Sequence, residues 1–400
     1  MLLTAGLVML GLALFALLTF ALGTWATVRH TSQPPATVPG SALPPVTILK
    51  PVKGLEEALE ANLRTFYEQD YPSEIEIVVA STERDDPALD VARAVAADYP
   101  AIRTRFVLSD PTSGLNPKVA NLRGALAAAT HDLVLQCDAN VRVRRDYLRR
   151  VVSELVASDG SLLTSMVVGV GEDSAGAAME NLQLSAFIAP AMCFALRFFD
   201  VTCVVGKSML FRRGELAELG GLDVVKDILA EDYVLGDLYT RAGKKALLSS
   251  TTAENVNVHV SVDRFMSRHA RWLKMRVVIH IPAFVADLLA NPVALATFAT
   301  LLSGFDWRIA SANIAIAAVK MAGDGWLVRR TRGTPMRLRH LLLAPVKDVL
   351  MGAMWPYAAI SRSVEWRGAR LRIGKMSRLR ADNGALPVRV VRRMLAPFRA

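Results

Sequence analysis

Residues Leu2–Val28 carry no charged side chain, and Arg29 and His30 follow directly. A run of this length can cross the roughly 30 Å hydrocarbon core of a bilayer as an α-helix. No positive side chain precedes the run, so it lacks the first region of a cleaved signal peptide. The sequence therefore predicts an N-terminal transmembrane helix over residues 1–29, followed by a proline-rich linker over residues 30–45.

The charge of the chain is concentrated at its C-terminal end. The net charge is +10, and from Arg362 onward eleven Lys and Arg residues stand against Glu365 and Asp382. A basic tail can bind nucleic acid or anionic lipid, and the apolar segments just before it favour the membrane, so we expect no nucleic-acid partner. A solvated tail that only fixes the topology is an equal alternative. The three cysteines lie in apolar surroundings, which indicates buried thiols in a reducing compartment.

The middle of the chain, residues 46–265, alternates short β-rich runs with helical stretches. The predicted strands are Val46–Leu49, Ile75–Val79, Arg103–Leu108, Leu133–Cys137 and Leu162–Val168. The predicted helices are Leu55–Tyr67, Pro87–Asp98, Lys118–Ala129 and Asp146–Ala157. This alternation predicts an α/β domain with a Rossmann-like, mainly parallel sheet, in which ligands bind beyond the carboxyl ends of the strands.

The last third is apolar again, but charged residues interrupt it. We expect an Arg-rich interfacial helix over 266–276, transmembrane or interfacial helices over 277–361, and a basic tail over 362–400. The apolar segments are Val277–Phe305, Ile309–Val328 and Leu341–Ile360. Basic clusters favour the cytoplasmic side, so we expect the α/β domain over residues 46–265 to lie on that side. Because three full spans would place the tail outside, one of the three segments should be interfacial or re-entrant.

Asp138 stands where the predicted strand Leu133–Cys137 ends, in the sequence "CDANVRV". Mg²⁺ and Mn²⁺ take oxygen ligands, usually one or two carboxylates with waters and substrate phosphates. Asp138 could supply the carboxylate, and Asn140 could help through its amide oxygen or through water. An ordinary turn is the alternative, since Asp and Asn favour turns.

Two further polar groups follow neighbouring predicted elements. Asp85 and Asp86 come after the second strand, where a carboxylate can accept a hydrogen bond from an imide N–H such as that of uracil. Asp-Asp-Pro is also a good helix start. Lys118 opens a helix whose N-terminus carries partial positive charge, a suitable neighbour for phosphate. A solvent-facing lysine at a turn is nearly as plausible.

Acidic and basic side chains then flank the end of this domain. Glu231 and Asp232 precede an apparent helix, where N-capping alone could explain Asp232. Arg268 and Arg271 lie one turn apart on a helical face, with Trp272 beside them. Arginine forks match diphosphate groups, while an amphipathic helix on lipid headgroups is the alternative.

The order of these groups resembles the inverting glycosyltransferases of the GT-A fold, and most closely the ceramide glucosyltransferase family (family-21 glycosyltransferases). The similar blocks are "LKPVKG", "YEQDYP", "DDPALDV", "GLNPKVANL", "CDANVRV", "VVGKSMLFRR", "LAEDYVLG" and "RHARWLKMR". The likeness covers about Val46 to Arg276 and extends weakly to "VEWRGARLRIG". It implies a GT-A catalytic domain with an N-terminal anchor and C-terminal membrane or interfacial helices.

The resemblance also implies a role for each matching position. The implied roles are base binding by Asp86, metal binding by Asp138, general base catalysis by Asp232, support by Lys118 and Glu231, and closure over donor and acceptor by Arg268, Arg271 and Trp272. The metal would be Mg²⁺ or Mn²⁺. Many relatives have Asp-x-Asp at the metal site, whereas here Asn140 takes the third position, which suggests looser metal binding.

The implied reaction moves a hexose, glucose first among them, from a UDP-sugar to the hydroxyl of a membrane lipid, with inversion of the anomeric carbon. Ceramide is the acceptor that the motifs favour. Diacylglycerol and hopanoid glycosyltransferases share the architecture and are the alternatives. A non-catalytic membrane protein that binds lipid or nucleotide is the alternative from a different class.

Overall fold

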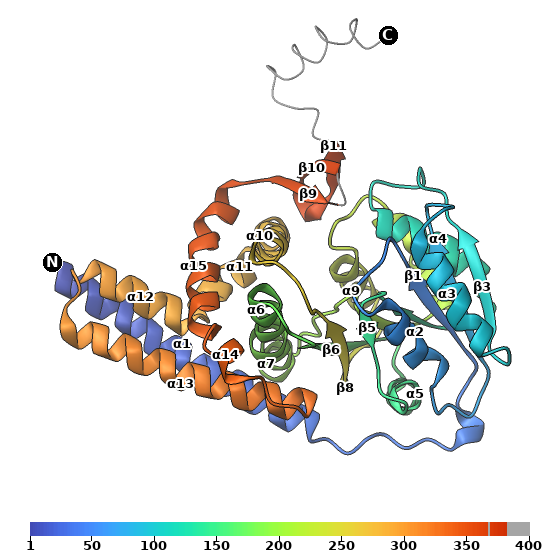
Figure 1. Ribbon diagram of the computed structural model, residues 1–400, viewed down its shortest axis with the longest axis horizontal. Helices are drawn as coiled ribbons and strands as arrows, with labels where there is room; N and C mark the ends of the chain where they lie inside the picture. Colours follow the sequence, from blue (N-terminus) through green and yellow to red (C-terminus); the bar gives the residue numbers. More distant parts are fainter. Residues whose placement is uncertain (367–368, 382–400) are drawn as a thin grey trace, which may run out of the picture.

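An eight-stranded sheet forms the centre of the protein, in the order β3-β2-β1-β4-β7-β6-β8-β5 (Figure 1). The computed structural model describes residues 1–366 and 369–381. The first half of the sheet is parallel throughout, with both neighbours of β1 aligned to it. Its strands are β1 (Val46–Pro51), β2 (Ile75–Ser81), β3 (Arg103–Leu108) and β4 (Leu133–Cys137). These strands confirm the predicted α/β class.

The second half of the sheet reverses direction at β7 (Ser208–Arg212), which runs antiparallel to β4 and to β6 (Leu162–Val170). β6 pairs in parallel with β8 (Ala246–Val256), and the short β5 (Val141–Arg142) closes the edge. In the β4–β7 register Cys137 faces Ser208. The carboxyl end of β4 therefore lies beside the start of β7, and this reversal determines what surrounds the residue after Cys137.

Helices cover both faces of the sheet and bury two apolar cores against it. α2 (Leu59–Tyr67), α3 (Pro87–Asp98) and α5 (Tyr147–Ala157) pack on one face. α4 (Pro117–Ala128), α8 (Arg213–Glu218) and α9 (Glu231–Arg241) pack on the other. The helix predicted from Leu55 begins at Leu59, because Ala58 has a left-handed backbone with φ 55° and ends the preceding turn.

A long bent helix that the sequence pattern did not predict follows β6. It consists of α6 (Ala175–Gln183), a π-helical turn (Leu184–Ile188) and α7 (Ala189–Phe199). Pro190 lacks a backbone N–H and cannot make the regular helical hydrogen bond, which fits the wider turn just before it. α6 packs against α10 (Val262–Ile279), the helix that contains the Arg-x-x-Arg-Trp sequence.

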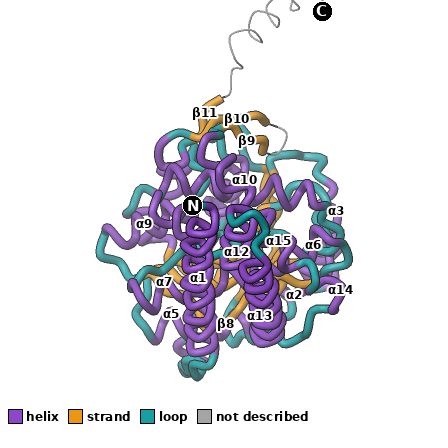
Figure 2. The backbone as a smooth tube through the Cα atoms, turned by 90° about the vertical axis from the view of Figure 1, so that its left-hand side faces the viewer, coloured by secondary structure: helices purple, strands orange, loops and turns teal. Residues whose placement is uncertain are grey.

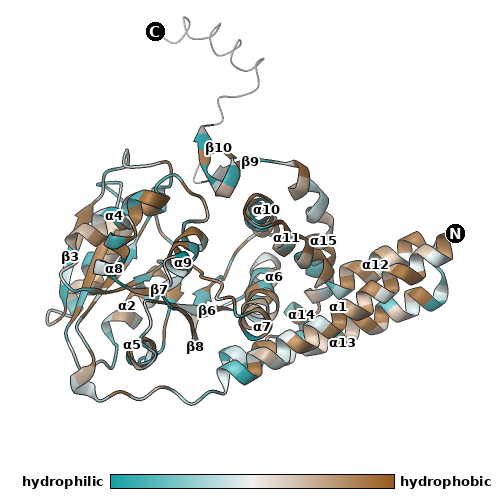
Figure 3. Ribbon diagram, turned by 180° about the vertical axis from the view of Figure 1, so that it is seen from behind, coloured by the Kyte–Doolittle hydropathy of each residue, from teal (hydrophilic) through white to brown (hydrophobic). Residues whose placement is uncertain are grey.

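The N-terminal helix α1 (Leu2–Thr31) packs with α12 (Pro292–Leu302) and α13 (Trp307–Arg332) in a bundle that projects from the α/β body (Figures 1 and 2). α1 approaches α12 closely at Gly6, where a Cβ would lie 2.7 Å from Cβ of Ser303. Most of α1 faces outward and is strongly apolar (Figure 3). This bundle is the part of the molecule suited to a bilayer.

Two helices among the described residues are long and apolar enough to cross a membrane, or three if one bent pair counts as a span. They are α1 and the α6–α7 helix, and half of the apolar window of the latter is buried inside the protein. The bent pair is α11 (Ile281–Leu289) and α12, which meet at 68°. Together with the exposed apolar bundle, these helices indicate a membrane protein.

The last apolar helix, α15 (Ala344–Ile360), does not extend the bundle. It follows the short α14 (Leu338–Leu341) and packs against α10 and α12 beside the α/β body (Figure 1). α15 is thus the best candidate for the segment that we expected to be interfacial. The domain boundaries given above remain proposals.

A small antiparallel sheet, absent from the sequence prediction, follows α15. It contains β9 (Ser363–Trp366), β10 (Ala369–Ile373) and β11 (Leu379–Ala381). Ser377 joins it to the start of α9, because Leu229 N donates to Ser377 O at 3.0 Å and Ala230 N donates to its Oγ at 3.1 Å. The rest of the predicted basic tail, residues 382–400, lies outside the described residues.

Candidate active site

The side chain of Lys118 lies at the centre of a group of charges at the carboxyl end of β4. Its Nζ is 3.1 Å from Asp138 Oδ1 and 2.9 Å from Glu231 Oε1, and it donates to Gly206 O at 3.0 Å. Three residues singled out from the sequence are thus brought together from three separate segments. We name Lys118, Asp138, Lys207, Glu231 and Asp232 the sheet-edge cluster.

The start of α4 positions Lys118. Asn116 caps this helix, since its Oδ1 accepts from Lys118 N at 3.0 Å and from Val119 N at 3.1 Å, and Pro117 occupies the first turn. Asn116 Nδ2 also donates to Ile228 O at 2.6 Å, three residues before Glu231. One capping residue therefore joins the helix that carries Lys118 to the loop that carries Glu231.

Lys207 completes the cluster, because the β4–β7 reversal places it beside Asp138. Its Nζ is 3.1 Å from Asp138 Oδ2 and donates to Asn140 Oδ1 at 2.8 Å. The two predicted metal ligands, Asp138 and Asn140, thus each direct an oxygen to the ammonium group of Lys207. Among the described residues no group of three or more His, Cys, Asp or Glu could hold a metal ion. Two converging oxygens fit a divalent ion that takes its other ligands from water and substrate phosphates.

Within the cluster, opposite charges outweigh burial for Asp138 and Lys118. Burial alone would raise the pKa of Asp138, but Lys118 and Lys207 hold that pKa well below its usual value. Burial would lower the pKa of Lys118, but Asp138 and Glu231 raise it well above its usual value. For Glu231, burial wins and raises the pKa, although Lys118 opposes it. Asp138 and Lys118 are therefore charged at neutral pH.

Asp232 contacts Gly206, the residue whose backbone carbonyl accepts from Lys118. Its Oδ2 accepts from Gly206 N at 2.7 Å and its Oδ1 from Tyr233 N at 2.8 Å. The N-cap of α9 is Ala230, so helix capping does not account for Asp232. A Cβ on Gly206 would lie 2.9 Å from Lys118 Nζ and 3.1 Å from Asp232 Oδ2. Only glycine lets its backbone hold both side chains at these distances without displacing one of them.

α10 brings the Arg-x-x-Arg-Trp sequence to the same site. Arg268 Nη1 is 2.9 Å from Glu180 Oε1, and His269 Nε2 is 3.1 Å from Glu180 Oε2. The His269 ring meets Trp272 edge-on at 5.0 Å between centroids. Arg268 is near enough to Lys207 to help lower its pKa, after burial as the main cause and against the attraction of Asp138. Arg271 is half-buried on this helix.

Asp86 lies at the same edge of the sheet, but its carboxylate makes no contact with the sheet-edge cluster among the hydrogen bonds and ion pairs of the described residues. Its Oδ1 accepts from Gly54 N at 2.9 Å and from Ala88 N at 3.0 Å, while Oδ2 accepts from Ser81 Oγ at 2.7 Å. The side chain is 2% exposed and caps α3. Its predicted role in binding the nucleotide base stays a prediction.

Sequence reasoning missed four residues that build the site. Gly206 and Lys207 stood within the quoted block "VVGKSMLFRR" without a role. Glu180 was detectable as an acid inside a long apolar segment, a pattern that usually marks a paired or functional group. Lys50 lies within β1; its Nζ donates to Asp138 O at 2.8 Å and lies 3.8 Å from the centroid of the Phe66 ring. Burial lowers the pKa of Lys50 to about 8.

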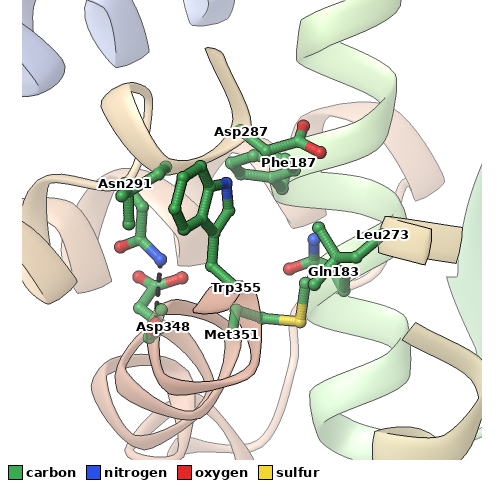
Figure 4. Close-up of a pocket in the computed structure, with 10 residues that line it drawn as sticks. Gln183, Phe187, Leu273, Asp287, Asn291, Asp348, Met351 and Trp355 are labelled. Atoms are coloured by element: carbon green, nitrogen blue, oxygen red, sulfur yellow. Dashed lines mark hydrogen bonds between the residues drawn. The ribbon is translucent and has the colours of Figure 1, made fainter. Parts of the chain in front are cut away.

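A small cavity lies between α6, α10, α11 and α15 (Figure 4). Its volume is about 10 Å³, room for a single water molecule. Asn291 Nδ2 donates to Asp348 O at 2.8 Å across one wall, and Trp355 and Gln183 point into the same space. The cavity shares no residue with the sheet-edge cluster and is too small for a nucleotide sugar.

Comparison with known proteins places this site in a family. Residues 8–379 match Glycosyl transferase family 21. Ceramide glucosyltransferase 1 of Caenorhabditis elegans is 28% identical over 268 residues, which cover 66% of this chain and 56% of that protein. Ceramide glucosyltransferase of Pyricularia oryzae is 26% identical over 309 residues, which cover 64% of this chain and 63% of that protein. The chain spans less than two thirds of the length of these relatives.

Among solved structures, the mannosyltransferase PcManGT from Pyrobaculum calidifontis, in complex with GDP-Man and Mn²⁺, is 17% identical with a TM-score of 0.49. The alignment covers 90% of this chain and 99% of that chain. The sequence match by itself extends from α1 through the small C-terminal sheet, and so includes every residue of the sheet-edge cluster. The chain belongs to glycosyl transferase family 21.

Proposed function

We propose that the protein transfers glucose, or another hexose, from a UDP-sugar to the hydroxyl of a membrane lipid, and that the lipid is ceramide. The observation that carries the proposal is the sheet-edge cluster itself. It places a charged lysine, a strand-end aspartate and a hydrogen-bonded Asp232 within one group at the carboxyl ends of the strands. Family membership and the ceramide glucosyltransferase relatives support the substrate class.

Asp138 and Asn140 would hold Mg²⁺ or Mn²⁺ in this proposal. When bound, the ion supplies positive charge that offsets the charge of the leaving diphosphate. Lys118 and Lys207 supply positive charge from the protein at the same place, within 3.1 Å of Asp138. A leaving UDP would therefore meet fixed charges that need no reorganisation during the reaction.

Asp232 would act as the general base. Two backbone N–H groups already orient its carboxylate. In a single displacement the acceptor oxygen bonds to the anomeric carbon as the bond to UDP breaks, and Asp232 takes the acceptor proton. Attack opposite the leaving group inverts the anomeric carbon, as in inverting glycosidases, where a carboxylate activates the nucleophile. Glu231 would assist by holding Lys118.

α10 would bind the donor phosphates and face the acceptor. Glu180 holds Arg268 and His269 at the α6 surface, and Trp272 packs against His269. Arg268 and Arg271 would close over the diphosphate from this fixed helix. The helix leads through α11 into the apolar bundle, so a lipid acceptor could reach Asp232 from the bilayer. Asp86 would contact the base once a nucleotide is bound.

The catalytic body would lie on the cytoplasmic side of the membrane. Two of the three bundle helices have basic residues in their last turn, α1 at Arg29 and α13 at Arg329–Arg332. Positively charged residues close to the ends of spans favour the cytoplasm. Protease protection of sealed membrane vesicles, with an epitope placed on the Pro-rich linker, would test this orientation.

Product analysis tests the proposed function. Membranes with the protein are incubated with UDP-glucose and Mg²⁺ or Mn²⁺, with ceramide and diacylglycerol offered together, and the lipids are analysed by mass spectrometry. We expect hexosylceramide that disappears in Asp138→Ala. Hexosyl-diacylglycerol would instead keep the mechanism and change the acceptor. If no lipid is glycosylated, including a hopanoid extract with UDP-galactose, the proposed function is wrong.

A further inference from the structure

The last turns of α1 pass the end of α7 (Figures 1 and 3). A large cavity lies between these two helices, and it shares no residue with the sheet-edge cluster. Its volume is about 530 Å³. The last turns of α1 form one wall and the last turn of α7 forms the other, and none of the residues assigned to catalysis lines it. A cavity of this size can hold a headgroup rather than a single water molecule.

The cavity is basic. Arg29 and Arg197 line it from opposite walls, and both side chains are exposed. Within residues 1–366 and 369–381, neither guanidinium forms an ion pair with a carboxylate, although Asp200 also lies on the rim. His30 is fixed there, because its Nε2 donates to Ser249 O at 3.1 Å. Two unpaired guanidiniums that face one space favour an anionic ligand.

The rim of the cavity is aromatic and exposed. Phe198 is 43% exposed, Phe199 is 69% exposed, and the neighbouring Trp25 is 47% exposed. Arg197 lies over the Trp25 ring at 5.7 Å, and Phe198 packs on the same ring at 6.2 Å between centroids. Aromatic side chains beside arginines are typical of the level at which a bilayer meets water.

The position of the cavity along α1 indicates that the anion comes from the membrane. The charge-free part of α1 ends at Val28, and Arg29 follows it. Acyl chains that lie along α1 would therefore place their headgroup phosphate at the height of Arg29. Basic pockets between apolar helices at this level bind the headgroups of anionic lipids. Continuity with the apolar surface of α1 favours a phospholipid over a soluble phosphate.

We propose that the cavity between α1 and α7 binds an anionic phospholipid, with its phosphate between Arg29 and Arg197 and its acyl chains along the outer face of α1. The ligand is distinct from the acceptor, because ceramide carries no phosphate. The proposal does not depend on the transfer reaction, and a protein that failed to make hexosylceramide could still bind this lipid.

Lipid retention tests the site. The full-length protein is placed in nanodiscs of phosphatidylcholine with a minor fraction of phosphatidylglycerol, and the lipids that stay bound after transfer to detergent are identified by native mass spectrometry. We expect phosphatidylglycerol to be enriched on the wild type. The double variant R29Q/R197Q is expected to lose at least roughly tenfold in apparent affinity, since each basic residue near a membrane surface contributes about 1 kcal/mol.

R308Q is a matched control, because Arg308 lies over the Trp307 ring at 5.5 Å at the opposite end of the bundle and should not affect retention. If the double variant does not fold, the single variants R29Q and R197Q test the same site, and we expect each to lose less apparent affinity for phosphatidylglycerol than the double variant. Retention that is unchanged in R29Q/R197Q, or lost equally in R308Q, would overturn the proposal. Displacement of the lipid by soluble glycerophosphate at equal concentration would also overturn it, and no displacement would support it.

Discussion

Two groups of lysines and carboxylates in this protein differ in how much of their side chains is exposed to solvent. The sheet-edge cluster is partly open: the side chains of Lys118, Asp138 and Lys207 are 14%, 20% and 21% exposed. The second group, here named the inter-helix cluster, joins α13 to α15 and is at most 3% exposed. It consists of Lys320, Asp324, Lys347 and Asp348.

The pairing differs as well. In the inter-helix cluster two lysines face two aspartates, with Lys320 Nζ 2.6 Å from Asp324 Oδ1 and Lys347 Nζ 2.7 Å from Asp348 Oδ1. The sheet-edge cluster has two lysines and three carboxylates, and within the described part of the chain Asp232 forms no ion pair; two backbone N–H groups donate to its carboxylate. A balanced and closed cluster holds helices together. An open cluster with an unpaired carboxylate can exchange its internal contacts for those of a substrate.

The largest expected effect is on the unpaired carboxylate. Asp232→Asn cannot take a proton, and we expect transfer to fall by roughly 10²- to 10⁴-fold while UDP-glucose binding survives. Initial rates and isothermal titration of the donor measure the two quantities. Asp237→Asn is the matched control on the same helix, because Asp237 only pairs with Arg241 at 2.8 Å. Wild-type transfer by Asp232→Asn would remove the base from the mechanism.

The next effect distinguishes the inter-helix cluster. Lys320→Met removes both hydrogen bonds that Asp324 accepts from Lys320 and leaves that buried carboxylate uncompensated, which we expect to cost roughly 3–5 kcal/mol of stability. Transfer per folded molecule should stay at the wild-type level. Thermal unfolding in detergent with parallel activity measurements tests both parts, and Lys226→Met, at an exposed position, is the control. Loss of specific activity without loss of stability would remove the distinction between the two clusters.

A smaller effect concerns Lys50, which is buried like the inter-helix cluster but forms no ion pair with a carboxylate in residues 1–366 and 369–381. Its pKa is about 8 in the folded protein, below the usual value of 10.5. Between these pH values the unfolded chain binds the extra proton, so this residue makes stability rise with pH, by at most about 3 kcal/mol. The rise should be missing in Lys50→Met, measured as the difference in melting temperature from the wild type across pH 8 to 10.5. A constant difference would contradict it.

The parallel half of the sheet was predictable because its strands are apolar runs separated by amphipathic helices, and all five predicted strands are present. The reversal at β7 was not, because strand direction depends on long-range pairing rather than on local pattern. The small sheet β9–β11 was missed because its strands are short, with four, five and three residues. The α6–α7 helix, which lies between β6 and β7, was also missed.

The same distinction holds for the candidate site: residues at the ends of predicted elements could be found from the sequence, and residues placed by long-range pairing could not. Asp138, Lys118, Glu231 and Asp232 could be found because each stands at the end of a predicted element. Lys207 and Gly206 could not be assigned a role, since their place beside Asp138 follows from the antiparallel β4–β7 register. Glu180 reaches Arg268 across 88 residues of sequence, and no spacing rule predicts such a contact.

One paired measurement tests the central claim most directly, that the open cluster performs the chemistry and the closed cluster holds the fold. Asp138→Ala and Asp324→Ala each remove one aspartate, and hexosylceramide formation per folded molecule is measured beside the melting temperature. We predict that Asp138→Ala loses the product and melts near the wild type, while Asp324→Ala melts lower and keeps its specific activity. The reverse pattern, or equal loss of product in both variants, would contradict the account.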